Sequence, residues 1–367
     1  ALLSPLKKQQ LHERTTYPDY RLYFAKALKH DENTGVVTKG AYESLKKAMK
    51  SGKTSDFEKI ELGLGRKLAS PQAAFDYTML GADSWATTMK PPPLIKSAET
   101  AGEMVELYWT AILRDIPFNH FHKHILSKVA AKELSSLSQF KGPKEKGIVT
   151  THTLLRGTFE GDLKGPYISQ FLWKNIPSLE STKTQKYNLA KSGISNDFMT
   201  NYQDWLLIQQ GGKSQRNLTL VRNPIFISTP RQLASYTHKD HPYQAALNAA
   251  LIMTGWGEKA LDDNNPSKKS STQNGFVNNG IVDITSLIGF ACQLALKATW
   301  YQKWIAHCRI RPEYLGYLIH DALLTRRLKV PTKIHQDVLN SLALQLTFNK
   351  QGSFFLSQSY PEGSPTH

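Results

Sequence analysis

Residues 298–313 read Ala298-Thr299-Trp300-Tyr301-Gln302-Lys303-Trp304-Ile305-Ala306-His307-Cys308-Arg309-Ile310-Arg311-Pro312-Glu313. The segment that leads into this stretch, from about Asp283, is apolar enough to predict a long buried helix. Proline disfavours helical geometry at the residue before it, so the helix should end before Arg311. We therefore expect a helical fold built around this segment. Its apolar residues are Leu287, Ile288, Phe290, Ala291, Leu294 and Leu296.

Helical periodicity recurs along much of the chain. Within 101–113, apolar residues return every three to four positions, which is typical of an amphipathic helix. Strand-like alternation is scarce and confined to 218–221 and 225–227. The sequence therefore predicts an all-α protein, a helical bundle with an N-terminal arm of short helices over 1–95 and a helical bundle domain over 96–367. Further helices are expected around 161–175, 196–210, 230–254, 281–307, 312–329 and 332–345.

Composition narrows the partners. The 367 residues carry a formal net charge of +16, from 46 basic and 30 acidic side chains. The basic residues are scattered rather than gathered in a stripe with aromatic residues, so we predict no nucleic-acid partner. No run of eighteen apolar residues occurs, which predicts no membrane span. The N-terminus shows no apolar core of a signal peptide.

Two motifs suggest a phosphate-binding loop and a metal site, but neither has all the residues that such a site needs. Gly211-Gly212-Lys213-Ser214 lacks the glycine that a phosphate-binding loop needs five residues before Gly212, where Leu207 stands. His120, His122 and His124 alternate and could face a metal ion, but no carboxylate or cysteine is close in sequence and Lys123 would repel a cation. We interpret the histidine segment as a polar loop.

Lys303 and Arg311 are the candidate binding residues. Lys303 lies near the end of the apolar helix, on the same face as Trp300 and His307. Arg311 follows on the turn, so both side chains could reach one pocket. Two buried cations would be costly without a counter-charge, which favours an anion between them. Two other interpretations stay open: Lys303 extends its ammonium to solvent, or Arg311 pairs with Glu313 or a helix C-terminus.

The run Trp300-Tyr301-Gln302-Lys303-Trp304, followed by His307 and then Arg311-Pro312-Glu313, resembles the first vanadate-binding motif of algal and cyanobacterial vanadium-dependent bromoperoxidases. Seven residues separate Lys303 from Arg311, as in the algal type, whereas related phosphatases usually have six. The resemblance implies the all-helical fold of the vanadium haloperoxidase and phosphatidic acid phosphatase superfamily, incomplete at the C-terminus. Matching stretches cover much of the chain: 108–118, 165–171, 204–212, 243–252 and 362–367.

The same resemblance assigns roles to four residues. Lys303 and Arg311 would bind the vanadate cofactor through its oxygens, and Lys303 would also be catalytic, by stabilising charge as peroxide is cleaved. Trp300 would lie in the halide region. His367 would be the catalytic histidine that precedes a Ser-Gly-His motif. That motif and the axial histidine that bonds vanadium are expected beyond His367, so these residues alone should contain no direct metal ligand and should be inactive.

The implied function is oxidation of bromide by hydrogen peroxide to a hypobromous-acid equivalent that halogenates small organic acceptors. The family also implies a homo-oligomer and a periplasmic or extracellular location. Two alternatives remain. An acid phosphatase on the same scaffold would bind phosphate, which is a tetrahedral anion like vanadate. A non-catalytic assembly fragment would use the chain only as a binding surface.

Overall fold

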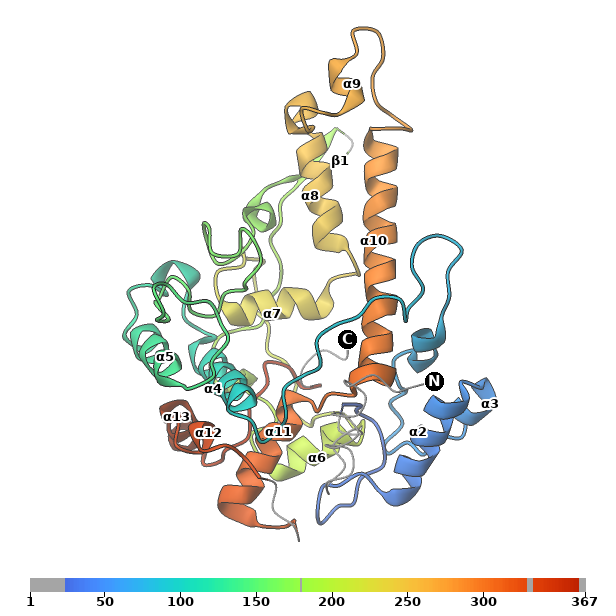
Figure 1. Cartoon of the computed structure of the whole chain (residues 1–367). Helices are drawn as coiled ribbons and strands as arrows, with labels where there is room; N and C mark the ends of the chain where they lie inside the picture. The colour runs from blue at the N-terminus through green and yellow to red at the C-terminus, as the bar shows by residue number, and fades with distance from the viewer. Residues whose placement is uncertain (1–23, 179, 329–332, 363–367) are drawn as a thin grey trace.

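The computed structural model describes residues 24–178, 180–328 and 333–362, and the regular secondary structure of this part of the chain is almost entirely helical (Figure 1). Its one sheet pairs β1 (Ile176–Ser178) with β2 (Ser181–Lys183) in antiparallel register. The prediction of an all-α fold is confirmed. The α-helices are α2 (Lys39–Ser51), α3 (Thr54–Phe57), α4 (Ala98–Leu113), α5 (Ile125–Ser136), α6 (Tyr202–Gln209), α7 (Pro230–Lys239), α8 (Gln244–Thr254), α9 (Pro266–Lys269), α10 (Ile281–Tyr301), α11 (Pro312–His320), α12 (Gln336–Leu339) and α13 (Leu342–Gln351).

Shorter turns of helix connect these elements. Five are 3₁₀ turns and two, η7 and η8, are π-helical and directly follow α10 and α11 in the described chain. They are η2 (Pro71–Phe75), η3 (Phe118–His120), η4 (Gln170–Trp173), η5 (Ile194–Asn196), η6 (Gly257–Ala260), η7 (Gln302–His307) and η8 (Asp321–Thr325).

The main core lies in the lower body of Figure 1, around α11. Every residue of α11 from Glu313 to His320 is buried. The ring of Trp205 on α6 stacks on Tyr317 with centroids 4.1 Å apart. The tyrosines of α11 also fix the N-terminal arm, because Tyr314 and Tyr317 donate hydrogen bonds to the carbonyls of Gly35 and Thr34. The arm therefore packs against the helix that follows Arg311.

Helix α4 confirms the helix expected over 101–113 and forms another wall of this core. Ser97 caps its N-terminus by accepting a hydrogen bond from the amide of Thr100. Tyr108 and Trp109 are fully buried, and each satisfies its polar atom. Tyr108 donates to the carbonyl of Phe354 at 2.6 Å, and Trp109 donates to the carboxylate of Glu133 at 2.6 Å. These bonds join α4 to α5 and to the chain after α13.

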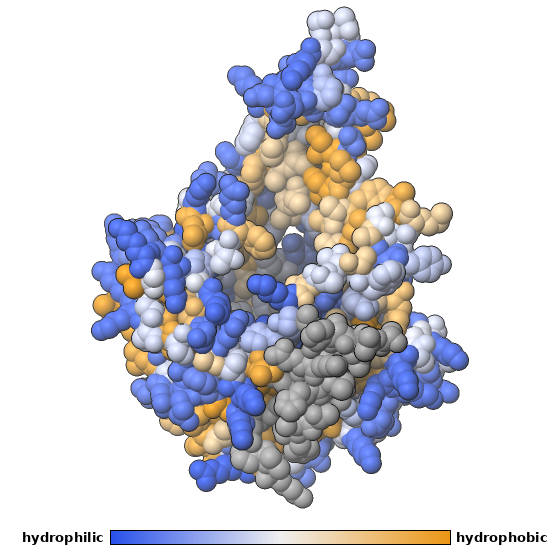
Figure 2. Space-filling view, viewed as in Figure 1, coloured by the Kyte–Doolittle hydropathy of each residue, from blue (hydrophilic) through white to orange (hydrophobic). Residues whose placement is uncertain are grey.

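The expectation that the helix from about Asp283 is buried is wrong. Helix α10 forms where it was predicted, but Trp300 is its one buried residue. Leu287, Phe290 and Leu296 are 59%, 45% and 41% exposed. Figure 1 shows α10 rising out of the body with α8 beside it, and Figure 2 shows apolar surface over the upper part of the molecule. An apolar sequence predicts that a helix will be covered, but it does not specify the surface that covers it.

Two other helix predictions are also wrong. Residues 161–175 contain only the short turn η4, and Gly161 and Gly165 adopt positive φ values of 92° and 71° that interrupt a helix. The single helix expected over 230–254 is two helices, α7 and α8. The break falls at His241-Pro242, where the proline disfavours helical geometry in the residue before it.

The histidine segment is a polar turn, as predicted. His120 ends η3, and His124 caps α5 by accepting a hydrogen bond from the amide of Leu126. No group of three or more potential metal ligands occurs in the part of the chain that the structure describes. The division into an arm over 1–95 and a bundle over 96–367 stays a prediction.

Candidate oxyanion-binding site

A wide π-helical turn positions Lys303. Helix α10 ends at Tyr301 and continues directly into η7, in which the amide of Cys308 bonds to the carbonyl of Lys303, five residues back. Such turns widen a helix locally and are frequent at functional sites. The chain then leaves the helix at Cys308, whose φ is 47°. The predicted helix end before Arg311 is confirmed, and Lys303 lies on the last turn.

The aromatic rings next to Lys303 hold its ammonium group. Its Nζ lies 5.3 Å from the ring centre of Trp300 and 5.4 Å from that of Trp304. Both are cation–π distances. The contact with Trp300 agrees with the prediction that the two residues share a face. These rings keep the lysine at the end of the helix and partly out of water.

Arg311 begins the next helix. It is the N-cap of α11, with extended backbone geometry, and Pro312 occupies the first helical position. The side chain is buried, and its Nε donates a 2.6 Å hydrogen bond to Oε1 of Glu313. The interpretation that Arg311 pairs with Glu313 is therefore correct as far as this bond goes. Oε1 of Glu313 also lies 3.3 Å from Nζ of Lys26, so two cations share one buried carboxylate.

Lys303 and Arg311 line the same hollow. Lys26, Arg66 and Lys67 from the N-terminal arm line it too. Five cationic side chains therefore surround one small space, and the carboxylate of Glu313 contacts two of them. The hollow is only ≈ 20 Å³, room for about one water, so a tetrahedral oxyanion would fit after the long basic side chains draw back. The remaining lining residues are Phe24, Ala25, Leu68, Ala69 and Trp304.

The pKa values reflect this crowding of positive charge. Burial lowers the pKa of Lys303 to about 8, with further lowering by the Arg311 charge and partial compensation by Glu313. Burial also lowers the pKa of Lys26 to about 7, and Glu313 offsets part of that effect. Burial alone would raise the pKa of Glu313, but the charges of Arg311 and Lys26 outweigh it and bring it to about 2. A bound anion would stabilise the charged form of both lysines.

Two indole groups differ in how their N–H is used. Trp300, the candidate for the halide region, donates its Nε1 hydrogen to the carbonyl of Ala69 at 2.9 Å. Trp304 lines the hollow itself. Its Nε1 atom is buried, and no residue in the described ranges accepts a hydrogen bond from it. The sequence did not single out Trp304, although it stands beside Lys303.

His367 lies outside the described residues, so the structure does not place this predicted catalytic residue. The segment before it is described as far as Glu362 and is tightly held. Arg114 donates from Nη2 to the carbonyl and the hydroxyl of Ser357, at 2.7 and 2.9 Å. The amides and carbonyls of Phe198 and Gln358 bond to each other in both directions at 2.9 Å. The chain that leads toward His367 is therefore fixed to the body.

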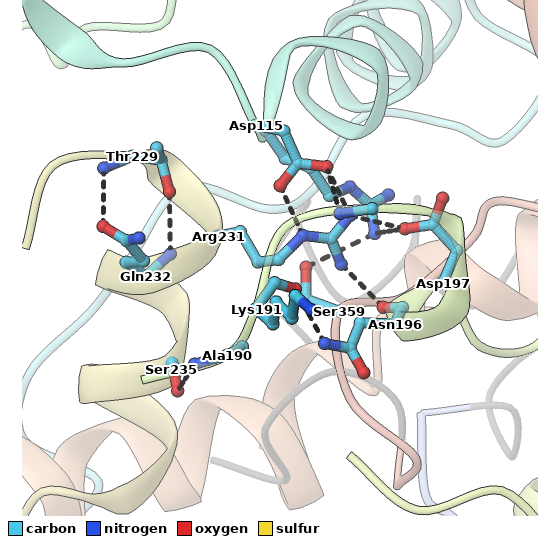
Figure 3. A network of polar contacts seen from close by, with 12 residues as sticks. Asp115, Ala190, Lys191, Asn196, Asp197, Thr229, Arg231, Gln232, Ser235 and Ser359 are labelled. Atoms are coloured by element: carbon cyan, nitrogen blue, oxygen red, sulfur yellow. Dashed lines mark hydrogen bonds and ion pairs between the residues drawn. The ribbon is translucent and has the colours of Figure 1, made fainter. Parts of the chain in front are cut away.

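A buried network of charged side chains lies next to this C-terminal segment (Figure 3). Arg231 on α7 bonds to both carboxylate oxygens of Asp115, at 2.6 and 2.8 Å, and to Asp197 at 2.7 Å. Arg114 and Lys350 also pair with Asp197, at 3.3 and 2.7 Å. Burial alone would raise the pKa of Asp197, but Arg114, Lys350 and Arg231 outweigh it and lower it. The network joins α4, α7 and α13 around the C-terminal segment.

Sequence reasoning missed the contribution of the arm. Lys26 and Arg66 face Arg311 from far away in the sequence, and the arm looks like an ordinary run of polar turns. The sequence indicated an ion-pair partner only for Arg311, because Glu313 follows it by two residues. Arg114 and Asp115 were noted as part of a matching stretch, without a role.

The chain is homologous over almost its whole length to vanadium-dependent bromoperoxidases. It is 31% identical over 371 residues to a vanadium-dependent bromoperoxidase of Ascophyllum nodosum, a match that covers 95% of this chain and 65% of that protein. Vanadium-dependent bromoperoxidases of Corallina officinalis and Corallina pilulifera are each 26% identical over 95% and 96% of this chain. No protein-family model matches the chain.

The fold agrees with these relatives. The homohexameric structure of the second vanadate-dependent bromoperoxidase from Ascophyllum nodosum superposes with a TM-score of 0.86 and 26% sequence identity. The superposition covers 99% of this chain and 64% of that one. The chain thus spans somewhat less than two thirds of the length of its Ascophyllum nodosum relatives. The predicted family resemblance is confirmed.

Proposed function

We propose that the protein is a vanadate-dependent bromoperoxidase, which oxidises bromide with hydrogen peroxide to a hypobromous-acid equivalent. The observation that carries the proposal is the convergence of Lys303 and Arg311 on one hollow, which three more basic side chains also line. A hollow lined by several lysine and arginine side chains favours an anionic ligand, because such side chains donate charged hydrogen bonds to oxyanions. The homologous bromoperoxidases support vanadate as that anion.

The residues of the hollow suit this cofactor. Arg311 offers planar N–H donors to the oxygens of a tetrahedral anion, and Lys303 offers a concentrated positive charge. The buried Nε1 of Trp304 is a further donor at the same place. When bound, vanadate supplies a Lewis-acid centre for peroxide activation. Lys303 would stabilise the negative charge that develops on oxygen as peroxide oxidises bromide. Small organic molecules accept the halogen.

The first experiment measures anion binding by the 367 residues. Isothermal titration with sodium orthovanadate is carried out on the wild type, on Lys303→Met and on Lys297→Met. Lys297 is a matched control because it lies on the same helix and pairs with Asp76 at 3.3 Å, away from the hollow. Only Lys303→Met should lose affinity, by roughly tenfold or more, the usual scale for a charged hydrogen bond. Equal binding by all three proteins would refute the assignment of the site.

The second experiment separates this function from that of a phosphatase. The protein isolated from its natural source is assayed for bromide-dependent turnover with peroxide and vanadate, and for hydrolysis of p-nitrophenyl phosphate. We expect the first activity, and its loss by roughly 10²–10³-fold in the Lys303→Met variant. Phosphate ester hydrolysis without bromide oxidation would favour the acid phosphatase. The absence of both activities would favour a non-catalytic assembly role.

We also propose that the chain forms a homo-oligomer and that protein, rather than lipid, covers α10. One helical stretch of the described residues, Ile281–Thr325, is long and apolar enough to cross a membrane by length and composition. However, α10 packs on α8 and η2, and the turn η7 that continues it lines the basic hollow. The solved relative is homohexameric, which supports a second copy as the partner.

The proposed location is periplasmic or extracellular. Peroxide and bromide from the surroundings are then the substrates, which is the argument for export. Cell fractionation with antibodies against the protein tests this location. Recovery with cytoplasmic markers would contradict it.

A further inference from the structure

Lys26 is a buried lysine that joins three separate parts of the chain. Its side chain is 2% exposed, and it lies on the N-terminal arm. Its Nζ is 3.3 Å from Oε1 of Glu313, at the start of α11. The same Nζ donates a 2.6 Å hydrogen bond to the carbonyl of Glu362, at the end of the described C-terminal segment. One ammonium group therefore connects the arm, the helix that carries the arginine partner, and the segment that leads toward residue 367.

The carboxylate of Glu313 transmits this connection to Arg311. Both Lys26 and the Nε of Arg311 contact the same oxygen, Oε1. A carboxylate held from two sides has little freedom, so the plane of the guanidinium group bonded to it is fixed as well. Burying an ammonium group is costly, and burial lowers the pKa of Lys26 to about 7. An ion pair at the surface would cost far less desolvation free energy than this buried arrangement.

The other end of Lys26 is fixed independently. Glu362 pairs with His238 of α7 at 3.4 Å, and the ring of His238 stacks on Tyr360 with centroids 3.9 Å apart. The hydrogen bond from Lys26 therefore reaches a backbone that is already attached to α7. The arm therefore lines the hollow and is joined through Lys26 to both α11 and the C-terminal segment.

We propose that Lys26 is a positioning residue of the oxyanion site, which aligns Arg311 through Glu313 and holds the C-terminal segment beside it through the carbonyl of Glu362. This inference rests on the proposed function, because it assumes that the hollow binds an oxyanion. Lys26 acts through its partners and does not need to contact the anion. Partners that orient a binding group in this way typically change affinity by roughly 10- to 100-fold.

The test measures the affinity for orthovanadate in Lys26→Met and in the double variant Lys26→Met/Glu313→Gln. Methionine keeps the length of the side chain and removes the charge. The double variant removes one positive and one negative charge, so the net charge of the site is the same as in the wild type. A pure charge effect would cancel in it, whereas a positioning effect would remain. In the single variant the buried carboxylate of Glu313 loses one of the two cations that contact it. The double variant has no carboxylate at position 313, so it provides a second protein should the single variant not fold.

We expect both variants to bind orthovanadate roughly 10- to 100-fold more weakly than the wild type. Lys47→Met is the matched control, because Lys47 makes a 3.3 Å ion pair with Asp56 on the surface of the arm, and it should bind like the wild type. Thermal unfolding of each protein ensures that binding is measured where the chain is folded. A double variant with wild-type affinity would overturn the positioning role.

A pH profile adds a readout that general destabilisation does not change. Sulfate has one charge state across pH 6 to 9, so its affinity reports the protonation of the protein. In the wild type the affinity should fall as pH rises through about 7, where Lys26 loses its proton, and again through about 8, where Lys303 does. The first step should be absent in Lys26→Met. If Lys303→Met also leaves anion binding unchanged, the proposed function fails; if only the Lys26 variants bind normally, this inference alone fails.

Discussion

The Nε of Arg311 donates to Oε1 of Glu313 at 2.6 Å, and Arg311 lines a hollow together with four other basic side chains. The same carboxylate oxygen lies 3.3 Å from Lys26, so a single negative charge serves two cations. Lys303 adds a third, and its pKa, lowered first by burial and then by the charge of Arg311, records their proximity. Glu313 therefore limits the freedom of the Arg311 side chain while leaving it at the hollow. That arrangement suits a site in which the arginine is already oriented and the lysine side chains move to admit an anion.

Glu313→Gln should destabilise the fold. The side chain is fully buried, and the change removes a carboxylate charge that contacts both Lys26 and Arg311. Removal of one partner from a buried ion pair typically costs about 3–5 kcal/mol of unfolding free energy. Urea denaturation at pH 7 measures it, with Glu103→Gln as the control, because Glu103 pairs with Arg309 near the surface. A loss no larger than that of the control would contradict the role of Glu313.

The contribution of Glu313 to the free energy of unfolding should depend on pH. The pKa of Glu313 is about 2 in the folded protein and 4.5 in its ordinary state, so the unfolded chain binds more protons between these values. The stabilisation by Glu313 is therefore fully present above about pH 4.5 and is lost as pH falls toward 2. The difference in stability between wild type and Glu313→Gln should shrink over this window. A constant difference from pH 6 to pH 3 would rule out the proposed ionised state.

Arg311→Lys should weaken oxyanion binding although it keeps the positive charge. A lysine cannot keep the Nε bond to Glu313 and present a planar set of donors to the anion at the same time. We expect roughly tenfold or greater loss of orthovanadate affinity, the scale of a lost charged hydrogen bond. Arg309→Lys, two residues earlier at a half-exposed position, is the control and should bind normally. Equal affinity in the two variants would show that charge alone is sufficient.

These arguments also define what the sequence could predict. Pro312 marked the end of the helix and the start of the next one, because its effect on the preceding residue is local. Lys303 and Arg311 were found because a short motif carries them. The exposed face of α10 could not be predicted, since apolar periodicity does not state what will cover a helix. Lys26 could not be found either, because its partners lie near the other end of the chain and no local pattern marks a distant ion pair.

Arg231→Met should destabilise the attachment of the C-terminal segment. Arg231 is fully buried between Asp115 and Asp197, and methionine would leave both carboxylates without their bridging cation (Figure 3). The expected loss is about 3–5 kcal/mol of unfolding free energy in urea denaturation. Arg222→Met, at an exposed position before α7, should change stability by less than about 0.5 kcal/mol. Similar effects of the two substitutions would mean that the network does not stabilise the fold.

Leu287→Glu should dissociate the proposed homo-oligomer without unfolding the chain. Leu287 is 59% exposed on α10, so a carboxylate there is solvated in a single copy and is costly only when a second copy covers the helix. Light scattering after size exclusion should give a multiple of the 41.3 kDa chain mass for the wild type and a smaller assembly for the variant. Ile194→Glu is the control, because Ile194 is 63% exposed on η5, away from α10.

A wild type that is monomeric in solution and floats with liposomes would instead assign the apolar face to a membrane surface. A variant with the mass of the wild type would place the contact between copies elsewhere on the molecule, because a buried charge at residue 287 could not then be tolerated.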